Sequence, residues 1–578
     1  MTMTKPLVHR GRRGRLRRAT AVGLALALTI AACGGDDDDD TTSGTDAAPA
    51  ATEPAGAAAT DAPAPDTDAD GTEPMGTEPA GTAPAAGDGP AMQEGGAATM
   101  VQFGSLVAMD PSLHRVGFAF AEAAIMASIF GHLAFMNPQT GEVELYFLES
   151  LEPNDDFTVW TLTLHDNIKF SDGTPLDAEA IKYNIERSAN PDTGSRFQAF
   201  AAELGLEVVD DLTLAVTLPE GNPGWPADLV ANFSGIGSPT AIQAALDAGE
   251  EVGLTPVGAG PFMLEDWEPG QTIHLVRNPY FGEWRPGRPY LDELTFENVP
   301  DRVQHVASLT SGAAQIAGTI GGTASAGMEQ EANAIISRVS GGAVINLNTQ
   351  IPPFDDIRAR QFMQLAFDRD LLAEANAPGT PKIENLFAES SPFYDARFDL
   401  PAQDKEAAQS LLDELAAEGK PLEFSFLSVS QPDQNALYNA LVAQLAEYEN
   451  VSIDIDVMTP TEQIAASTNG EYQALPWGMY IVNPIPGLYQ QVLPTGYLNY
   501  GKWSNDVVNA ALADFATADT FEEQQAIWDV VQEQMLIDPP VVFLDQAINT
   551  IGYADGFYVP RTLNLGTLPL WDEVGYTS

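Results

Sequence analysis

The periodicity of hydrophobic and polar positions changes repeatedly along this chain, from about residue 97 onward. Residues 158–164 (TVWTLTL) alternate with a period of two, which is typical of a half-buried strand. Apolar residues recur at helical spacing between 118 and 133, which predicts a helix there, and residues 100–104 favour a short first strand. Strands and helices are therefore interspersed, which indicates an α/β protein.

Helix boundaries are marked by capping residues and prolines. Asp177 stands in an N-cap position before a predicted helix over 178–188. Thr520 and Glu523 form a capping box at the start of a later helix. Pro539 and Pro540 then predict the end of that helix, because proline cannot continue it.

The first 33 residues predict a targeting segment. A basic stretch precedes an apolar run from Ala21 to Ile30, which is too short to span a bilayer as a helix. The run ends in small residues before Cys33, and this pattern resembles the lipobox of bacterial lipoproteins. The resemblance implies cleavage before Cys33 and acylation of its thiol. The alternative is an ordinary signal peptide with a chance cysteine, and export by the Sec or the twin-arginine route stays open.

Residues 34–96 have the composition of a disordered tether. They begin with five aspartates, and Ala, Thr, Pro, Gly and acids then dominate. A flexible chain of this length reaches on the order of 40–50 Å. We expect it to hold a globular body just off a membrane. A calcium site in the aspartate run is the alternative.

The charge is strongly negative, at −56 for the whole chain. The first 33 residues hold seven of the 26 basic residues and the next 63 hold 15 of the 82 acids, which leaves about −48 on the rest. Such a body should be repelled by nucleic acid and by anionic lipid. A saline habitat and a cationic ligand are both consistent with this charge.

Cysteine and histidine limit the metal chemistry. Cys33 is the only cysteine, which excludes an intramolecular disulfide and a cysteine-based metal site. The six histidines all precede residue 306. A bare metal held by imidazoles from both ends of the body is therefore excluded, whereas a chelated metal remains possible. We predict no metal site and no cofactor.

Several motifs occur in one order along residues 97–578. They are FTVWTLTLHDNIKFSDGTPLDAEAIKYNIER, VGAGPFMLEDWEPGQTIHLVRNPYF, YLDELTFENVPDRVQHVASLTSGAAQIA, PPFDDIRARQFMQLAFDRDLL and YGKWSNDVVNAALADF. Together they resemble extracellular solute-binding protein family 5, the large proteins that serve peptide and nickel importers. The collinear order makes the resemblance specific, because each motif alone would be weak.

The resemblance implies an α/β, two-lobe, periplasmic-binding-protein-like fold (type II, large cluster C type) with a hinge between the lobes. Lobe I would comprise residues 97–322 and a return over 541–578, and lobe II would comprise 323–540. A monomer at the outer face of the cytoplasmic membrane would capture a small solute between the lobes and deliver it to the permease and ATPase subunits of an ABC importer. The solute stays open among a peptide, an oligosaccharide and a chelate.

The family motifs also suggest ligand-binding residues. Trp477-Gly478-Met479-Tyr480 matches a Trp-x-x-Asp segment whose Asp holds the amino group of peptide ligands. Tyr480 cannot neutralise an ammonium as a carboxylate does, which favours a neutral or sugar-like ligand stacked on Trp477. The other candidates lie on segments expected to border the cleft, with packing in the core as the alternative for each. They are Asn346, Asn348, His114, Phe118, Phe233 and Ser234. Asp355, Arg358 and Arg360 are expected to pair charges at a helix start instead.

Other function classes have less support. The chain has no Gly-x-Ser-x-Gly elbow and no His-Glu-x-x-His helix, so we do not predict an enzyme. A secreted hydrolase is the weakest alternative. A ligand sensor, adhesin or holdase on the same fold is the stronger one, because a fold does not determine a function.

Overall fold

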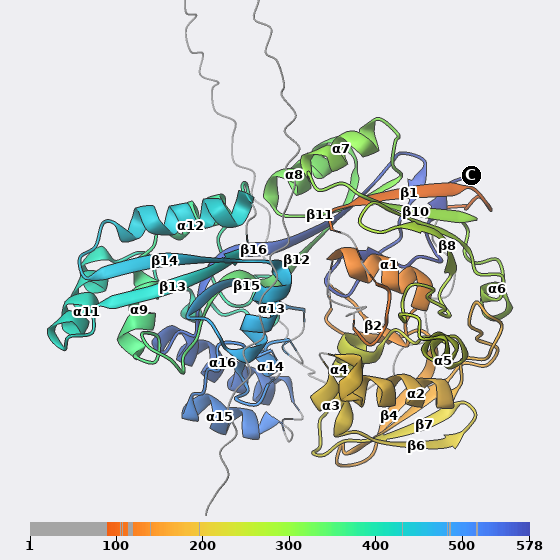
Figure 1. Ribbon diagram of the computed structural model, residues 1–578, viewed down its shortest axis with the longest axis horizontal. Helices are drawn as coiled ribbons and strands as arrows, with labels where there is room; N and C mark the ends of the chain where they lie inside the picture. Colours follow the sequence, from red (N-terminus) through yellow and green to blue (C-terminus); the bar gives the residue numbers. More distant parts are fainter. Residues whose placement is uncertain are drawn as a thin grey trace, which may run out of the picture. The chain divides into compact units, whose positions relative to one another are not determined.

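The structure of the protein is a computed structural model (Figure 1). It describes residues 90–104, 106, 108–113, 120–138, 140–195, 197–429, 432–482, 484, 487–496, 498–515, 518 and 520–578. The predicted signal peptide, Cys33 and nearly all of the predicted tether lie outside these residues.

One sheet of ten strands runs through the described part of the chain. In their order across the sheet, the strands are β14 (Val451–Met458), β13 (Leu422–Val429), β15 (Ala474–Ile481), β12 (Asn333–Leu347), β16 (Val541–Tyr553), β11 (Ile316–Ile320), β1 (Ala97–Gln102), β10 (Glu293–Asn298), β9 (Thr272–Arg277) and β8 (Phe262–Glu268). β1 starts three residues earlier than its pattern predicts, because Ala97 already pairs with Glu293 of β10.

Parallel pairs lie toward both ends of this sheet. β1 pairs in parallel with β10 and β11, and β13 pairs in parallel with β14 and at one position with β15. Between them run the long antiparallel strands β12 and β16 (Figure 1). β12 and β16 therefore connect two groups of parallel strands, which we call the β1 group (β1, β10, β11) and the β13 group (β13, β14, β15).

The pairing of β12 with β16 is interrupted at a glycine pair. The register shifts between Arg338 and Gly342 and again between Gly342 and Val344. Gly341 has a φ of +70°, and a Cβ there would lie 1.9 Å from the carbonyl oxygen of Met479. A side chain would therefore force β12 and β15 apart, and the sequence places glycine where the strands approach most closely.

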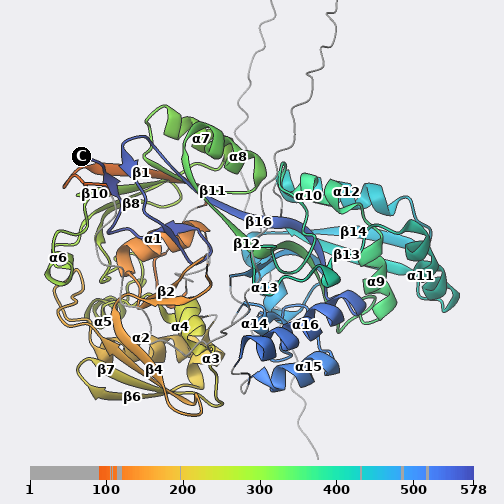
Figure 2. The same cartoon turned by 180° about the vertical axis from the view of Figure 1, so that it is seen from behind.

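Helices cover both faces of the β13 group. They are α9 (Ile357–Leu365), α10 (Arg369–Asn376), α11 (Lys405–Ala417), α12 (Pro432–Leu445), α13 (Pro460–Asn469), α14 (Tyr489–Val492), α15 (Asp506–Ala513) and α16 (Phe521–Ile537), with a short 3-10 turn at Ala396–Phe398. Figure 2 shows α10 and α12 on one side of these strands and α14 to α16 on the other. Phe426 belongs to the apolar cluster with Leu372 and Leu437, whereas Met479 belongs to the cluster with Trp528.

The chain between β1 and β8 forms a smaller antiparallel sheet with helices. Its strands are β4 (Leu148–Pro153), β5 (Val159–Leu164), β6 (Gly205–Asp210) and β7 (Thr213–Thr217), which pair in the order β4-β5-β7-β6. β2 (Ala134–Met136) and β3 (Val143–Leu145) form a separate two-stranded sheet. The helices of this half of the chain, up to β12, are α1 (Phe120–Phe130), α2 (Ala178–Ala189), α3 (Gln198–Ala202), α4 (Trp225–Phe233), α5 (Pro239–Ala248), α6 (Phe281–Trp284), α7 (Val303–Thr310) and α8 (Gly322–Glu331), with a 3-10 turn at Pro191–Thr193.

Two local predictions are confirmed here. Buried and half-buried residues alternate strictly along β5. Asp177 caps α2 by accepting a hydrogen bond from the backbone N–H of Ala180 at 2.8 Å.

After β16 the chain packs against the β1 group. The remaining strands are short: β17 (Phe557–Tyr558), β18 (Thr562–Leu563), β19 (Leu568–Pro569) and β20 (Gly575–Tyr576). Trp571 packs edge-on against Phe296 of β10, with ring centroids 5.3 Å apart. Asp572 is fully buried and accepts a hydrogen bond from Tyr146 at 2.7 Å, and its second oxygen lies 2.5 Å from Arg285. These contacts join the end of the chain to residues more than 270 positions earlier.

Candidate functional site

A pocket of about 360 Å³ lies where β12 and β16 run between the two strand groups. Phe103 follows β1, Arg302 follows β10, and Ile320 and Gly321 end β11. The carboxyl ends of all three parallel strands of the β1 group therefore open into one pocket. Ligands of open α/β sheets bind at this edge.

The opposite wall comes from the β13 group and its helices. Tyr480 lies near the carboxyl end of β15, and Asn376 and Ala377 form the end of α10. β16 contributes the run Asp545–Asn549. We call this space the crossing pocket, and its lining comprises Phe103, Arg302, Ile320, Gly321, Ala343, Asn376, Ala377, Tyr480, Asp545, Gln546, Ala547, Ile548, Asn549, Leu565 and Thr567.

Asp545 is the buried acid of the crossing pocket. Only 7% of its surface is exposed, and Asn376 donates a hydrogen bond of 2.6 Å to its Oδ1. Burial raises the pKa of Asp545 to about 6, although the hydrogen bond from Asn376 and the charge of Arg302 act in the opposite direction. At neutral pH the pocket therefore holds a carboxylate in poorly solvated surroundings.

Tyr480 lies flat over its own strand. A Cβ on Gly478 would fall 2.3 Å from the ring of Tyr480, so the glycine makes room for the ring. The residue is 37% exposed because it borders the pocket, yet the surrounding protein and then Asp545 raise the pKa of its hydroxyl to about 12. The hydroxyl is therefore neutral and offers both a donor and an acceptor.

Arg302 brings a positive charge to the same pocket. Its guanidinium lies over the ring of Phe103, 4.3 Å from the ring centroid. Its charge lowers the pKa of both Tyr480 and Asp545 against the larger effect of burial. The crossing pocket thus combines one cation, one buried acid and several neutral polar groups.

Trp477 and Met479 lie on the other face of β15 from Tyr480. The regular register between β15 and β12 makes side chains alternate across the sheet. Trp477 packs against Tyr500, with ring centroids 5.0 Å apart, and Met479 is buried in the cluster with Trp528. Trp477 and Tyr480 therefore lie on opposite faces of β15, whereas the family motif implied that both border the ligand.

Asn348 and Asn346 are both buried in the sheet. The side-chain amide of Asn348 donates to the carbonyl oxygens of Gly470 at 2.9 Å and Tyr472 at 3.0 Å. Both amide hydrogens of Asn348 are therefore used to hold the connection from α13 to β15. Asn346 is 9% exposed and pairs with Leu475 and Val541. Neither residue lines the crossing pocket.

Phe233 and Ser234 lie in the core at the end of α4. The ring of Phe233 stacks on Phe200 at 5.9 Å, and Ser234 donates a hydrogen bond of 2.6 Å to the carbonyl oxygen of Ala134. Their exposed fractions are 4% and 2%, which leaves little surface for a ligand. His114 and Phe118 lie outside the described residues.

Arg358 and Arg360, two of the residues expected to pair charges, both form ion pairs. Asp356, rather than Asp355, caps α9 and pairs with Arg358 at 2.7 Å. Arg360 forms an ion pair with Asp538 at the end of α16. The pair of Arg360 with Asp538 connects α9 to the end of α16, and none of these residues belongs to the pocket lining.

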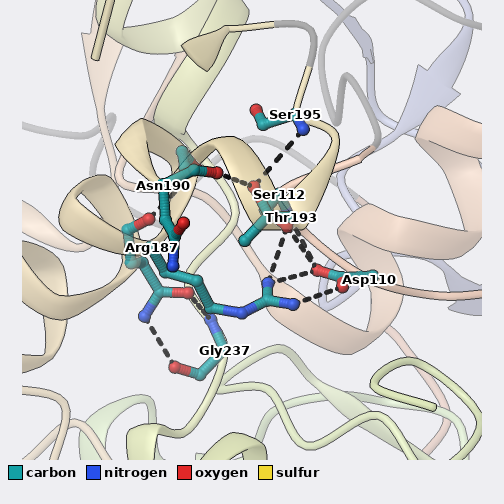
Figure 3. Close-up of polar contacts among 9 residues, drawn as sticks. Asp110, Ser112, Arg187, Asn190, Thr193, Ser195 and Gly237 are labelled. Carbon is teal, nitrogen blue, oxygen red and sulfur yellow. Dashed lines mark hydrogen bonds and ion pairs between the residues drawn. The ribbon is translucent and has the colours of Figure 1, made fainter. Parts of the chain in front are cut away.

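The loop after β1 is held by an ion pair that the sequence analysis did not identify. Arg187 of α2 donates to both carboxylate oxygens of Asp110 at 2.6 Å and to Ser112 at 2.6 Å (Figure 3). Asp110 is 4% exposed. Burial would raise its pKa, but the hydrogen bonds and charge of Arg187, with Ser112, lower it below the usual value. The signal in the sequence was an acid in a turn and an Arg at a helix end.

A second cavity of about 350 Å³ has different chemistry. Val143 of β3 and Pro226 and Ala227 of α4 line one side, and Phe515 and Gln524 line the other. Its only charged lining residue is Glu142, which is exposed. The crossing pocket is therefore the better candidate for specific recognition, because it contains buried polar groups.

Two negative findings concern the described part of the chain. It contains no cluster of three or more His, Cys, Asp or Glu side chains that could hold a metal ion. No helix within it is both long and apolar enough to cross a membrane.

The sequence matches a known family over more than half of its length. Residues 142–497 match Bacterial extracellular solute-binding proteins, family 5 Middle. The chain belongs to this family. Family 5 solute-binding proteins are extracytoplasmic binding components of transporters and not enzymes.

Several proteins with similar sequences are named glutathione-binding protein GsiB. The glutathione-binding protein GsiB of Salmonella paratyphi A is 30% identical over 243 residues, which is 41% of this chain and 46% of that protein. GsiB of Pectobacterium atrosepticum is 26% identical over 443 residues, or 72% of this chain and 83% of that protein. The chain thus spans about half the length of the first of these relatives and most of the second.

Solved structures share the fold. The protein AgaA of A. tumefaciens R10, in complex with agropinic acid, has a TM-score of 0.72 at 19% identity, covering 84% of this chain and 99% of that one. The periplasmic binding protein DppA of Helicobacter pylori, in complex with the peptide STSA, gives 0.72 at 18% identity, with the same coverage. The predicted periplasmic-binding-protein-like α/β fold is therefore confirmed.

Proposed function

We propose that this family 5 protein is the lipid-anchored solute-binding component of an ABC importer and that it captures its solute in the crossing pocket. The observation that supports the proposal is that the residues lining the pocket come from both strand groups. Arg302 follows the β1 group, Tyr480 belongs to the β13 group, and Asp545 lies on the strand that joins them. A solute in this pocket would touch both strand groups at once.

Capture would follow from this arrangement. A solute that contacts both lobes binds the closed form more tightly than the open form, and this difference in affinity shifts the population toward closure. Here the lobes are those expected at residues 97–322 with 541–578, and at 323–540. Closure would remove water from Asp545 and Tyr480 and strengthen each polar contact to the solute. The permease and ATPase subunits would then receive the solute without any bond being made or broken.

The proposed solute is small and polar. A volume of about 360 Å³ lies toward the small end of ligand sites, which are roughly 300–1,000 Å³. Relatives are named for glutathione, and solved structures of the same fold hold agropinic acid and a short peptide. We infer a solute about the size of a di- or tripeptide. Because the acid Asp545 lines the same pocket as Tyr480, we favour such a solute over the neutral, sugar-like ligand that Tyr480 by itself suggests.

Binding is testable by thermal shift on the purified protein. The panel comprises glutathione, di- and tripeptides, oligosaccharides, polyamines and metal chelates. A bound solute stabilises the folded protein by mass action and so raises its melting temperature. At a free solute concentration of 100 times Kd, the stabilisation is about 2.7 kcal/mol. Tyr480→Ala should weaken the stabilisation, whereas Tyr394→Ala should leave it unchanged, because Tyr394 is not part of the pocket lining. Failure of every panel member to stabilise the protein would contradict the proposal.

The anchor requires a separate experiment. If Cys33 is acylated after export, wild-type protein should fractionate with membranes and incorporate a labelled fatty acid. Cys33→Ala should abolish the label, because the thiol that would carry the lipid is absent. A label that persists in the variant would show that the lipid is attached elsewhere.

A further inference from the structure

Asp545 introduces a charge into the largely buried strand β16. The strand reads VVFLDQAINT from Val541 to Thr550, and Asp545 is the only charged residue in it. It lies beyond residue 497, where the family match ends. The match to the family therefore does not account for this acid.

A β-bulge directs the side chain into the crossing pocket. Gln546 pairs with Gly342 and Phe543 pairs with Val344, so that Leu544 and Asp545 together face the single residue Ala343. A bulge of this kind redirects a side chain, and bulges are frequent beside functional sites. Asp545 and Ala343 both line the pocket.

The carboxylate of Asp545 has one donor and no ion-pair partner among the described residues. Asn376 donates to Oδ1 at 2.6 Å, and no Lys, Arg or His nitrogen of the described chain lies within 4 Å of either oxygen. Lys382 forms a backbone bridge with Asp545, but its ammonium lies 2.7 Å from Asp370. Arg302 and Tyr480 are the other charged or titratable groups that act on Asp545.

A buried carboxylate without an ion-pair partner is costly in an empty pocket. Loss of hydration disfavours the charge unless a cation and hydrogen-bond donors replace the water. The single hydrogen bond from Asn376 replaces only part of the hydration that the carboxylate loses. A solute that brings an N–H₃⁺ group to Oδ2 would replace the rest, with the Tyr480 hydroxyl as a second acceptor.

We propose that Asp545 binds a protonated amine of the solute, so that the crossing pocket selects solutes with an ammonium group over those without one. This inference rests on the proposed function and names its substrate class. Asp545 of β16 would then supply the carboxylate that position 480 of β15 lacks.

Matched pairs of solutes test the proposal on the full-length protein. The pairs are trialanine with N-acetyl-trialanine, and glutathione with its N-acetylated form, measured by calorimetry at pH 7.5. Each free amine should bind at least about tenfold more tightly than its acetylated twin. Asp545→Asn keeps the shape and the acceptor for Asn376, and it should remove this preference. Asp266→Asn, at an exposed position on β8, should keep it.

The pH profile gives a second measurement. Affinity for the free amine should fall as the pH drops below about 6, where Asp545 becomes protonated, and Asp545→Asn should lose this dependence. If acetylated and free solutes bind equally, or if Asp545→Asn keeps the preference, the inference is wrong while the proposed function stands. If an uncharged oligosaccharide is the only solute bound, the inference is equally wrong. If no solute binds, both fail.

Discussion

Asp110 and Arg187 are 77 residues apart in the chain, yet they form a bidentate ion pair in which both side chains are almost completely buried. Ser112 completes the set of donors around the carboxylate. The pair fixes the loop after β1 to α2 (Figure 3). Buried charges of this kind are stable only as a pair, because removing one residue leaves the charge of its partner buried and uncompensated.

Replacing Arg187 should therefore destabilise the protein strongly. Arg187→Met leaves Asp110 buried without its cation, and we expect a loss of about 3–5 kcal/mol in the free energy of unfolding. Arg397 is the matched control, because its side chain is 66% exposed and pairs with Asp395 and Asp529 on the surface. Arg397→Met should cost no more than about 1 kcal/mol. Urea unfolding followed by tryptophan fluorescence measures both, and equal losses would contradict the distinction.

Asp228 of α4 makes stability depend on pH. It is 1% exposed, only one of its oxygens accepts a hydrogen bond, from Asn222 at 3.0 Å, and burial raises its pKa to about 7. The folded state then binds more protons than the unfolded state between pH 4 and pH 7. Stability from this group is therefore present at low pH and decreases as pH rises toward 7, by up to about 1.4 kcal/mol per pH unit.

Asp228→Asn should remove that dependence. The variant should match the wild type near pH 4 and exceed it in stability at pH 8, as measured by urea unfolding across this range. The exposed acid Asp266 supplies the control, since Asp266→Asn also removes one negative charge but leaves the buried carboxyl of Asp228 in place and should retain the decrease in stability between pH 4 and pH 7. A variant that is less stable than the wild type at pH 8 would show that the carboxylate of Asp228 has a stabilising partner in the folded protein.

Within single elements, strand pairing decides which side chains can act together. Trp477, Gly478 and Tyr480 are almost adjacent in sequence, but β15 turns Trp477 toward Tyr500 and Tyr480 toward the crossing pocket. Helix ends follow simpler local rules. Thr520 and Glu523 form the predicted capping box of α16, which ends at Ile537 before the two prolines. A cap needs only four consecutive residues, whereas a strand face depends on a partner far away in sequence.

Gly478 tests the importance of the Tyr480 ring position. In Gly478→Ala the new Cβ would collide with the ring at 2.3 Å, so Tyr480 should rotate and solute affinity should fall by about tenfold or more. Gly282→Ala is the control, because its Cβ would meet only a carbonyl oxygen at an ordinary 3.7 Å. Calorimetry with the best solute of the panel gives both affinities. Unchanged binding in Gly478→Ala would remove Tyr480 from the site.

For the molecule as a whole, the dominant feature is a net charge of −56. Like charges spread over one body repel one another and oppose the compact state. The ion pairs of the surface neutralise only part of this excess, because the chain has 26 basic residues against 82 acids.

Salt should therefore stabilise the protein. Raising NaCl from 0.1 M to 1 M shortens the screening length from about 10 Å to about 3 Å, and we expect the melting temperature to rise by several degrees. Calorimetric scans measure the change. KCl should give the same increment, because screening depends on ionic strength. A response to one cation only would indicate a specific site instead of general repulsion.

The sequence by itself determined the local elements and the family: the alternation of β5, the caps of α2 and α16, and collinear motifs, most of which lie within the matched residues 142–497. The local elements depend on neighbours within a few residues, and the family depends on the order of motifs along the chain. Both can be recognised in the amino-acid sequence. Only the tertiary structure decided the crossing pocket. Arg302, Tyr480 and Asp545 are brought together by strand pairing across more than 240 residues, and a bulge in one pair of strands directs Asp545 inward. Periodicity within a segment carries no information about such long-range register, because a shift of one residue reverses every side chain.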